Sequence, residues 1–402
     1  MNARAAVTLV LVLTAWCAGV LTASGATGAG LAEAAPWLVR LTGGLKGVYA
    51  PVEGRPLAWS LAWSPVEGTK RSGEIVVTGA DCVVRVALDF DAADNRLGWR
   101  VKEGRVDLAA WLPALAKRPE LATALEGMTA TGTLVITGEG AIKGEEISGA
   151  LNVTWTEGTL SHAEQGWSLE GVSIRAGGDV AELAKGHVPV EVDVRTISTG
   201  RFGARALKVR ASLAGFSLAE VLLVYVEIAG GQVVAKPFSF ELREPKLGVD
   251  ISMERVGLQD IAALVPDFLA DGRGRVNGAV RINWSESDGL SLGAGYILID
   301  PSERAEVRFR PNPGLLTSSL PPDVLALYPG LTNVEMGKAT LLAERFEVRL
   351  SPEGDVEGRS ATVVIVGGPQ DKTLKAPLVL TINVRGPLAP LIKIGSAIGG
   401  SK

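Results

Sequence analysis

The chain has 402 residues, with 40 Lys and Arg against 44 Asp and Glu, which gives a formal net charge of −4. These charges are spread without a basic block, which argues against a nucleic-acid interface, where cations cluster. Glycine is frequent at 49 residues and aromatic residues are few at 5%, as in proteins with many short strands, and the length admits two or three domains or one continuous sheet.

An apolar segment from Ala5 to Leu21 follows a single early charge, Arg4. Its length lies near the lower limit for a membrane-spanning helix and near the upper limit for the core of a cleaved signal peptide. We predict that residues 1–23 are a signal-anchor or signal peptide, with the uncleaved anchor favoured. Small residues from Ala23 to Ala35 permit the alternative, cleavage, and both predict that the rest of the chain is exported.

Beyond this segment, apolar and polar residues alternate with a period of two, which predicts strands with one apolar and one solvated face. Such one-sided strands indicate an antiparallel sheet, because the strands of a doubly wound parallel sheet are apolar on both faces. The apolar positions are Val84, Val86, Leu88, Val188, Val190, Val192, Val194, Leu207, Val209, Val276, Val280, Ile282, Val307, Phe309, Phe346, Val348, Leu350, Leu378, Leu380, Ile382 and Val384.

Helical periodicity is confined to a few segments. We interpret them as caps over local openings of the sheet, since their apolar stripes need a surface to cover, and ordinary crossover helices are the alternative. The segments are Leu108 to Leu125 with a break near Pro119, Leu218 to Ala229, Leu258 to Ala270, and Asp323 to Tyr328.

One of these helical patterns belongs to an internal repeat. Arg105-Val106-Asp107-Leu108 and Arg255-Val256-Gly257-Leu258 each open an amphipathic run, followed by a glycine-spaced strand, a tryptophan and another glycine-spaced strand. The helical part of the first copy is about eight residues longer. The repeat predicts two modules built on one plan, which bury their apolar faces by stacking in an elongated array.

Residues able to carry catalysis are scarce. His162 and His187 are the only histidines, and we predict that both lie on the surface. Gly272, Gly274 and Gly278 do not have the spacing of a dinucleotide-binding loop, and the predicted helix precedes them instead of following. Cys82, the only cysteine of the exported part, excludes an internal disulfide there, and we predict a buried thiol. We therefore predict no enzyme, no metal site and no cofactor.

Six tryptophans, Trp59, Trp63, Trp99, Trp155, Trp167 and Trp284, fall in or beside the predicted strands. Packing in the core or at a sheet edge is the favoured interpretation. Contact with lipid or with a partner is the alternative.

The carboxy-terminal half resembles a known family. The stretch LQDIAALVPDFLADGRGRVNGAVRI, then DGLSLGAGYILIDP, then KAPLVLTINVRGPLAPLIKIG resembles the carboxy-terminal domain of YdbH-like proteins, also labelled "dicarboxylate transport". These proteins belong to the AsmA-like group that includes TamB. The resemblance covers residues 205–395. It divides the chain into the segment 1–23, an amino-terminal β-groove segment 24–204 and a YdbH-like domain 205–402.

The resemblance implies an elongated, twisted, open antiparallel β-groove in the bacterial periplasm, anchored in the inner membrane by residues 5–21. The groove would carry phospholipid acyl chains between the inner and outer membranes, with the apolar strand positions as its lining. A small outer-membrane lipoprotein adding strands at the carboxy-terminal edge is the implied partner. The alternative is a non-enzymatic structural or assembly factor of the envelope, whose apolar face is closed into a packed β-core.

Overall fold

The computed structural model describes residues 44–385, except 53–54, 118–124, 145, 200–202, 216, 243–245, 261–268, 286–288, 301, 315, 319, 329 and 370–377. The predicted anchor therefore lies outside the described residues. The described part is mainly β, with 22 strands in antiparallel pairings and four short helices. It divides into two compact units: unit 1 holds the described residues of 1–200 and 207–221, and unit 2 those of 201–206 and 222–402.

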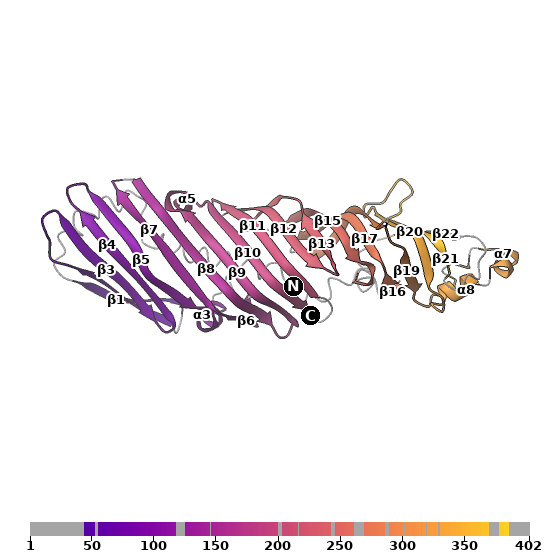
Figure 1. The fold of residues 1–402 in the computed structure, drawn as a ribbon, viewed down its shortest axis with the longest axis horizontal. Helices are drawn as coiled ribbons and strands as arrows, with labels where there is room; N and C mark the ends of the chain where they lie inside the picture. Colours follow the sequence, from indigo (N-terminus) through magenta and orange to yellow (C-terminus); the bar gives the residue numbers. More distant parts are fainter. Residues whose placement is uncertain are drawn as a thin grey trace. The chain divides into compact units, whose positions relative to one another are not determined.

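Unit 1 is an antiparallel sheet in which chain order is almost the order of the strands. Pairing runs from β1 through β2, β3, β4, β5, β7, β8 and β9 to β10, and the short β6 pairs with the far end of β8. Figure 1 shows α3 beside β6 at one end of these strands and α5 at the other. The elements are β1 (Leu45–Val52), β2 (Arg55–Trp63), β3 (Lys70–Gly79), β4 (Cys82–Asp91), β5 (Arg96–Asp107), α3 (Leu108–Leu115), β6 (Met128–Thr131), β7 (Thr133–Lys143), β8 (Glu146–His162), β9 (Trp167–Asp179), α5 (Val180–Ala184) and β10 (Val188–Thr199).

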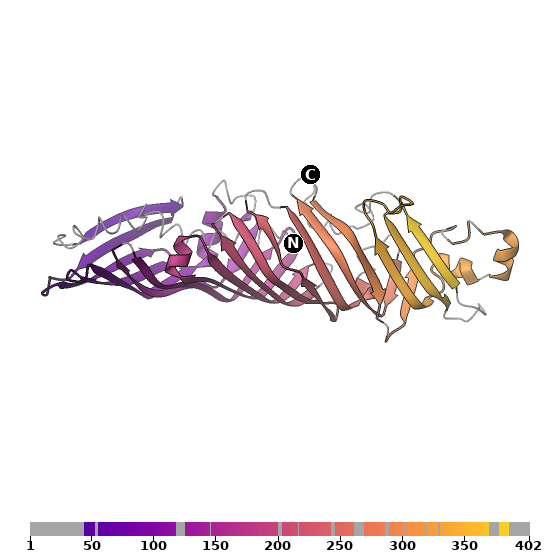
Figure 2. The ribbon, with the colours of Figure 1, turned by 90° about the horizontal axis from the view of Figure 1, so that it is seen from above.

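Unit 2 follows the same rule of neighbouring antiparallel strands. Pairing runs through β12, β13, β15, β17, β18, β20, β21 and β22, and β19 joins β16 to β20. The last three strands lie side by side in both views (Figure 1, Figure 2). The elements are β13 (Gly231–Ala235), β14 (Phe238–Glu241), β15 (Leu247–Gly257), β16 (Leu269–Arg273), β17 (Arg275–Ser285), β18 (Gly289–Ile299), β19 (Ala305–Phe309), α7 (Pro322–Leu327), α8 (Gly330–Glu335), β20 (Leu341–Leu350), β21 (Ala361–Pro369) and β22 (Leu378–Val384). Strands β11 (Gly203–Ala214) and β12 (Leu218–Ile228) contain residues of both units.

The internal repeat is confirmed as a structural repeat, with one copy in each unit. In both copies a strand ends in a helical turn, a short strand follows, and a glycine at positive φ starts the next long strand: Gly132 at +104° and Gly274 at +110°. The amide of the first helical residue donates to that glycine's carbonyl, over 3.1 Å from Leu108 to Gly132 and 2.9 Å from Leu258 to Gly274. The two copies therefore share a local backbone plan.

The helix predictions have mixed outcomes. The segment starting at Leu108 is helical as α3, which ends at Leu115, and the predicted break near Pro119 lies outside the described residues. The first turn of α3 is capped by the Asp107 carboxylate, which accepts from the amide of Ala109 at 2.8 Å. The helix predicted over Asp323 to Tyr328 is confirmed as α7. The segment starting at Leu258 is helical at residues 258–260, but its predicted end is wrong because Leu269 and Ala270 belong to β16.

The helix predicted over Leu218 to Ala229 is wrong. This segment forms strand β12, which pairs with β13 across a two-residue turn at Ala229 and Gly230. Both turn residues have positive φ, at 54° and 71°, as a tight hairpin requires. The segment is rich in Val, Tyr and Ile, which pack well on a pleated sheet, and this preference prevails over the helical spacing of its leucines.

Candidate functional site

An apolar face covers one side of the unit 1 sheet. The strand registers set Leu61 opposite Ile75, Ile75 opposite Val86, and Val86 opposite Val101. Side chains between these positions point to the other face, where Arg85 pairs with Glu103 at 3.3 Å and Arg100 with Glu139 at 2.8 Å. One face of the sheet is thus aliphatic and aromatic, and the other is polar.

Burial on this face differs between its α3 end and its middle. Near α3, Val106, Leu134 and Trp155 are at most 3% exposed, and the buried side of α3 lies over this end. The middle positions Ile75 and Val86 are only half-buried. A packed interior would exclude water from these positions as it does at Val106. Among the described residues of unit 1, the apolar face is therefore closed at the α3 end and open in the middle.

Unit 2 has a similar apolar face with a larger closed part. Val276, Val307 and Phe309 are fully buried, and they pack with Val334 of α8 and Leu341 of β20 into a dry core. Towards the other end of the strands, Val280, Leu350 and Ala361 pack among half-buried Ile251 and Val384. The closed core and this half-buried margin share the face formed by β17, β20 and β21.

The structure places the predicted apolar positions on strands, but with different degrees of burial. Those buried are Leu88, Val188, Val190, Val194, Val276, Val280, Val307, Phe309, Phe346 and Leu350. Those half-buried are Val84, Val86, Val192, Leu207, Val209, Ile282, Val348, Leu380, Ile382 and Val384, and Leu378 is the first residue of β22. The registers bring Val86, with Val84, and Val192 onto the unit 1 face, and Val280, Val348 and Ile382 onto the unit 2 face.

Several residues of the open part of the unit 1 face do not stand out in the alternating pattern of the sequence. Ile75 and Val77 lie in a run of three apolar residues with Val76, so the alternation there is hidden. Leu61 lies between alanines and tryptophans, and Ile136 lies in a strand interrupted by Gly138 and Gly140. The spacing of Trp59 and Trp63 could have indicated that Leu61 lies on the same face as these tryptophans, because residues an even number of positions apart on a strand share a face.

The two histidines do not form a reactive pair. His187 is exposed and its Nδ1 lies 3.0 Å from a carboxylate oxygen of Glu182. The prediction of a surface position is wrong for His162, which is 7% exposed. His162 is the last residue of β8, its ring centroid is 6.0 Å from that of Trp167, and its Nδ1 accepts from the amide of Gln165 at 3.3 Å. It is a hydrogen-bonded residue that closes a turn.

Cys82 is buried as predicted, and burial raises the pKa of its thiol to about 11. Within the described ranges, no group of three or more His, Cys, Asp and Glu is arranged to hold a metal ion. No described helix has the length and apolarity needed to cross a membrane.

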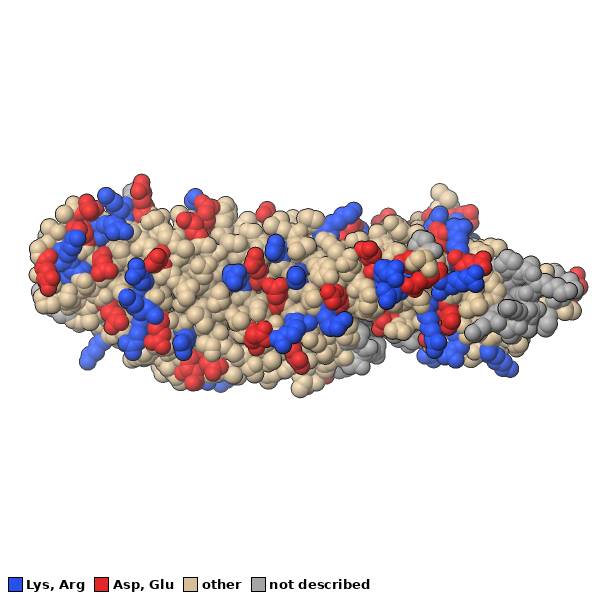
Figure 3. Space-filling view, viewed as in Figure 1, with Lys and Arg blue, Asp and Glu red and all other residues tan. Residues whose placement is uncertain are grey.

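The polar faces carry both signs of charge in alternation. Figure 3 shows Lys and Arg interspersed with Asp and Glu over one side of the described surface. On β20, the carboxylate of Glu347 is buried between Arg345, whose Nη2 is 2.6 Å away, and Arg349. Hydrogen bonds from Arg345 and then Arg349 hold the pKa of Glu347 below its usual range. The two signs of charge therefore alternate over the described surface in this view, which does not suit binding to a polyanion.

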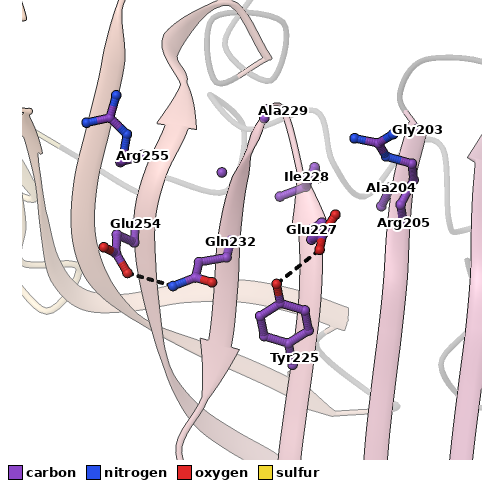
Figure 4. Close-up of a pocket in the computed structure, with 12 residues that line it drawn as sticks. Gly203, Ala204, Arg205, Tyr225, Glu227, Ile228, Ala229, Gln232, Glu254 and Arg255 are labelled. Carbon is purple, nitrogen blue, oxygen red and sulfur yellow. Dashed lines mark hydrogen bonds between the residues drawn. The ribbon is translucent and has the colours of Figure 1, made fainter.

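A cavity of about 340 Å³ with a mixed polar and apolar lining lies in unit 2, at the turn between β12 and β13. Its carboxylates already have neutral donors: Tyr225 donates to Glu227 over 3.2 Å and Gln232 to Glu254 over 2.6 Å (Figure 4). The guanidinium of Arg255, directed away from Gln232, binds Asp300 at 2.8 Å. Both lining carboxylates therefore already accept a hydrogen bond, and the described lining contains no Ser, Cys or His to act as a nucleophile.

Comparisons with protein-family models, with curated proteins and with solved structures found no match to this chain. The functional conclusion therefore depends on the residues and the geometry described above.

Proposed function

We propose that this protein handles lipids in the bacterial envelope, and that the open parts of its apolar sheet faces contact phospholipid acyl chains. The observation that supports the proposal most strongly is the half-buried strip across β2 to β5 in unit 1. A contiguous apolar surface left partly open in a folded protein marks an interaction site. The side chains of the strip carry no charge, so the ligand that suits it has an extended apolar part.

Polar ligands suit these faces poorly. A charged diacid on Ile75 and Val86 would lose water without gaining a hydrogen-bonding partner, at a cost of several kcal/mol. A peptide would have the same difficulty, because the face of a sheet offers no free backbone groups to pair with the peptide backbone. An acyl chain has no polar groups along its length, and it gains roughly 0.8 kcal/mol for each buried CH₂ group.

The resemblance to YdbH-like and other AsmA-like proteins supports the same proposal and extends it. It suggests transfer of phospholipid between inner and outer membranes through a continuous groove, with residues 5–21 as inner-membrane anchor. The residues quoted for the resemblance include β17 and β22, which contribute Val280 and Ile382 to the unit 2 face. A strand-adding outer-membrane lipoprotein at the carboxy-terminal edge remains the partner proposed on this basis.

A transfer assay tests the proposed function. The full chain is reconstituted in donor vesicles with a fluorescent phospholipid, and arrival of the lipid in acceptor vesicles is followed over time. We expect Val86→Asp to slow protein-dependent transfer at least tenfold, because the carboxylate interrupts the apolar strip. The matched control is Arg85→Asp, on the same strand but on the polar face. Equal transfer by both variants and the parent protein would refute the proposal.

A second function is favoured by the closed core of unit 2. There Phe309, Val307 and Val334 are fully buried in one hydrophobic cluster, as expected of a structural or assembly factor with an ordinary β-core. Lipid handling predicts that unit 1 binds phospholipid, whereas a structural or assembly role predicts that it does not.

A further inference from the structure

Three tryptophans of unit 1 lie on the apolar face against glycines of neighbouring strands. Trp59 covers Gly47, Trp63 covers Gly73 and Trp99 covers Gly140. A Cβ built on these glycines would lie 2.8, 2.5 and 2.7 Å from the respective indole atoms. The rings therefore rest on the backbone of the adjacent strand, and a side chain at any of these glycines would displace them. This arrangement keeps the face shallow where bulky residues would otherwise project from it.

The strand registers order these residues into rows that cross the strands. One row reads Trp59, Val77 and Val84, the next Leu61, Ile75, Val86 and Val101, and the third Trp63, Gly73, Leu88, Trp99 and Gly140. Neighbouring rows are two residues apart along each strand, which is about 6.6 Å. The middle row consists of half-buried aliphatic residues and has a tryptophan-containing row on either side.

The flanking indoles differ in how open they are. Trp59 is 37% exposed and Trp99 is half-buried, so both retain surface for a ligand. The guanidinium of Arg71 lies over the ring of Trp63, 5.4 Å from its centroid. This pair lies at the β2 end of the third row.

We infer that the middle row, which we call the β2–β5 track, binds one phospholipid acyl chain across the strands, with Trp59 and Trp99 contacting the chain from either side. The inference rests on the proposed function and specifies where in unit 1 the lipid lies. Four adjacent strands span about 14 Å at roughly 4.8 Å per spacing, so the track holds a large part of an acyl chain. Indoles suit its flanks, because their large apolar rings lose little conformational freedom on contact.

Quenching of tryptophan fluorescence by brominated lipid tests the track. The full chain carries Trp16→Phe and Trp37→Phe and is incubated with phosphatidylcholine whose acyl chains are brominated near their middle. The protein is then purified in a detergent without bromine, which removes the lipid that is not bound to it. We expect the bound lipid to quench the fluorescence, and the quenched part to fall at least twofold in Trp59→Phe/Trp99→Phe. Trp167→Phe, at a site that is 5% exposed, is the control and should leave the quenching unchanged.

A second pair of variants tests the track without tryptophan fluorescence. Val86→Trp fills the middle row and should lower the phospholipid retained per protein at least threefold, whereas Arg85→Trp on the polar face should not. Unchanged quenching in Trp59→Phe/Trp99→Phe, or unchanged lipid retention in Val86→Trp, would overturn the track even if lipid transfer persists. Absence of any retained lipid in the parent protein would overturn the proposed function together with the track.

Discussion

The openness of the unit 1 face can be measured by placing the same charge at two valines of that face. Val106 on β5 is 3% exposed near α3, whereas Val86 on β4 is half-buried. In Val106→Asp the carboxylate has no described partner at this closed end, and burying it should cost more than about 4 kcal/mol. That is a large fraction of the roughly 5–15 kcal/mol that stabilises a domain.

Val86→Asp should cost much less. Losing the partial burial of the valine removes roughly 1–2 kcal/mol, and the poor fit of Asp to a strand removes about 1 kcal/mol more. Urea unfolding followed by circular dichroism measures both variants, with Val86→Ala and Val106→Ala separating lost packing from charge. We expect Val86→Asp to unfold cooperatively at a somewhat lower urea concentration, and Val106→Asp to be largely unfolded in buffer. If the two aspartates are equally damaging, the middle of the face is as closed as the α3 end, and the reasoning fails.

Three further predictions concern the repeat, the buried thiol and a buried carboxylate. Gly274→Ala should destabilise unit 2 by about 1–3 kcal/mol, because φ is +110° at this position. The control is Gly368→Ala, whose added methyl group meets no atom within 4 Å, and it should be near neutral in the same thermal unfolding experiment. Equal effects of the two substitutions would contradict the conformational argument. In a Cys17→Ser background, Cys82 should react with a thiol reagent at pH 8 far more slowly than a free cysteine does. With a pKa of about 11, roughly a thousandth of the Cys82 side chains are thiolate at that pH. Rapid labelling of the folded protein would be inconsistent with the burial of Cys82. The lowered pKa of Glu347 stabilises the folded state at pH values above the unfolded-state pKa of about 4.3, and this contribution is lost as the pH falls through the lower folded-state pKa. Glu347→Gln should therefore be less stable than the parent protein at pH 7 and nearly as stable at pH 2. A stability difference that does not change with pH would argue against the ion pairs with Arg345 and Arg349.

The sequence predicted the features that depend on local periodicity. Alternation identified the strands of Val188 to Val194 and Val84 to Phe90, and the repeated Arg-Val motif identified the two copies that share the amide-to-glycine hydrogen bonds. Alternation could not distinguish open from closed positions, because Val276 and Val86 each follow an arginine on a strand with one apolar face. What separates them is the helix and strand packed above Val276, a tertiary contact that no local pattern encodes.

Two errors have equally specific causes. The segment from Leu218 to Ala229 shows leucine spacing compatible with a helix, but its β-branched residues and the Ala229-Gly230 turn place it in a hairpin. The burial of His162 follows from its position at the end of β8 against Trp167, which depends on the pairing of β8 with β9. The tryptophan rows were hidden for the same reason, since cross-strand neighbours are defined by register and not by sequence distance.

Capture of lipid by a photo-crosslinking residue inside cells tests the central claim most directly. The residue is introduced at Val86 for unit 1 and at Ile382 for unit 2, with Arg85 and Val379 as controls on the opposite faces of the same strands. After irradiation the intact protein is weighed by mass spectrometry. We predict a phospholipid adduct at Val86 and Ile382 and none at the controls. If the protein mass shows no lipid adduct with the crosslinker at Val86 or at Ile382, the account is contradicted.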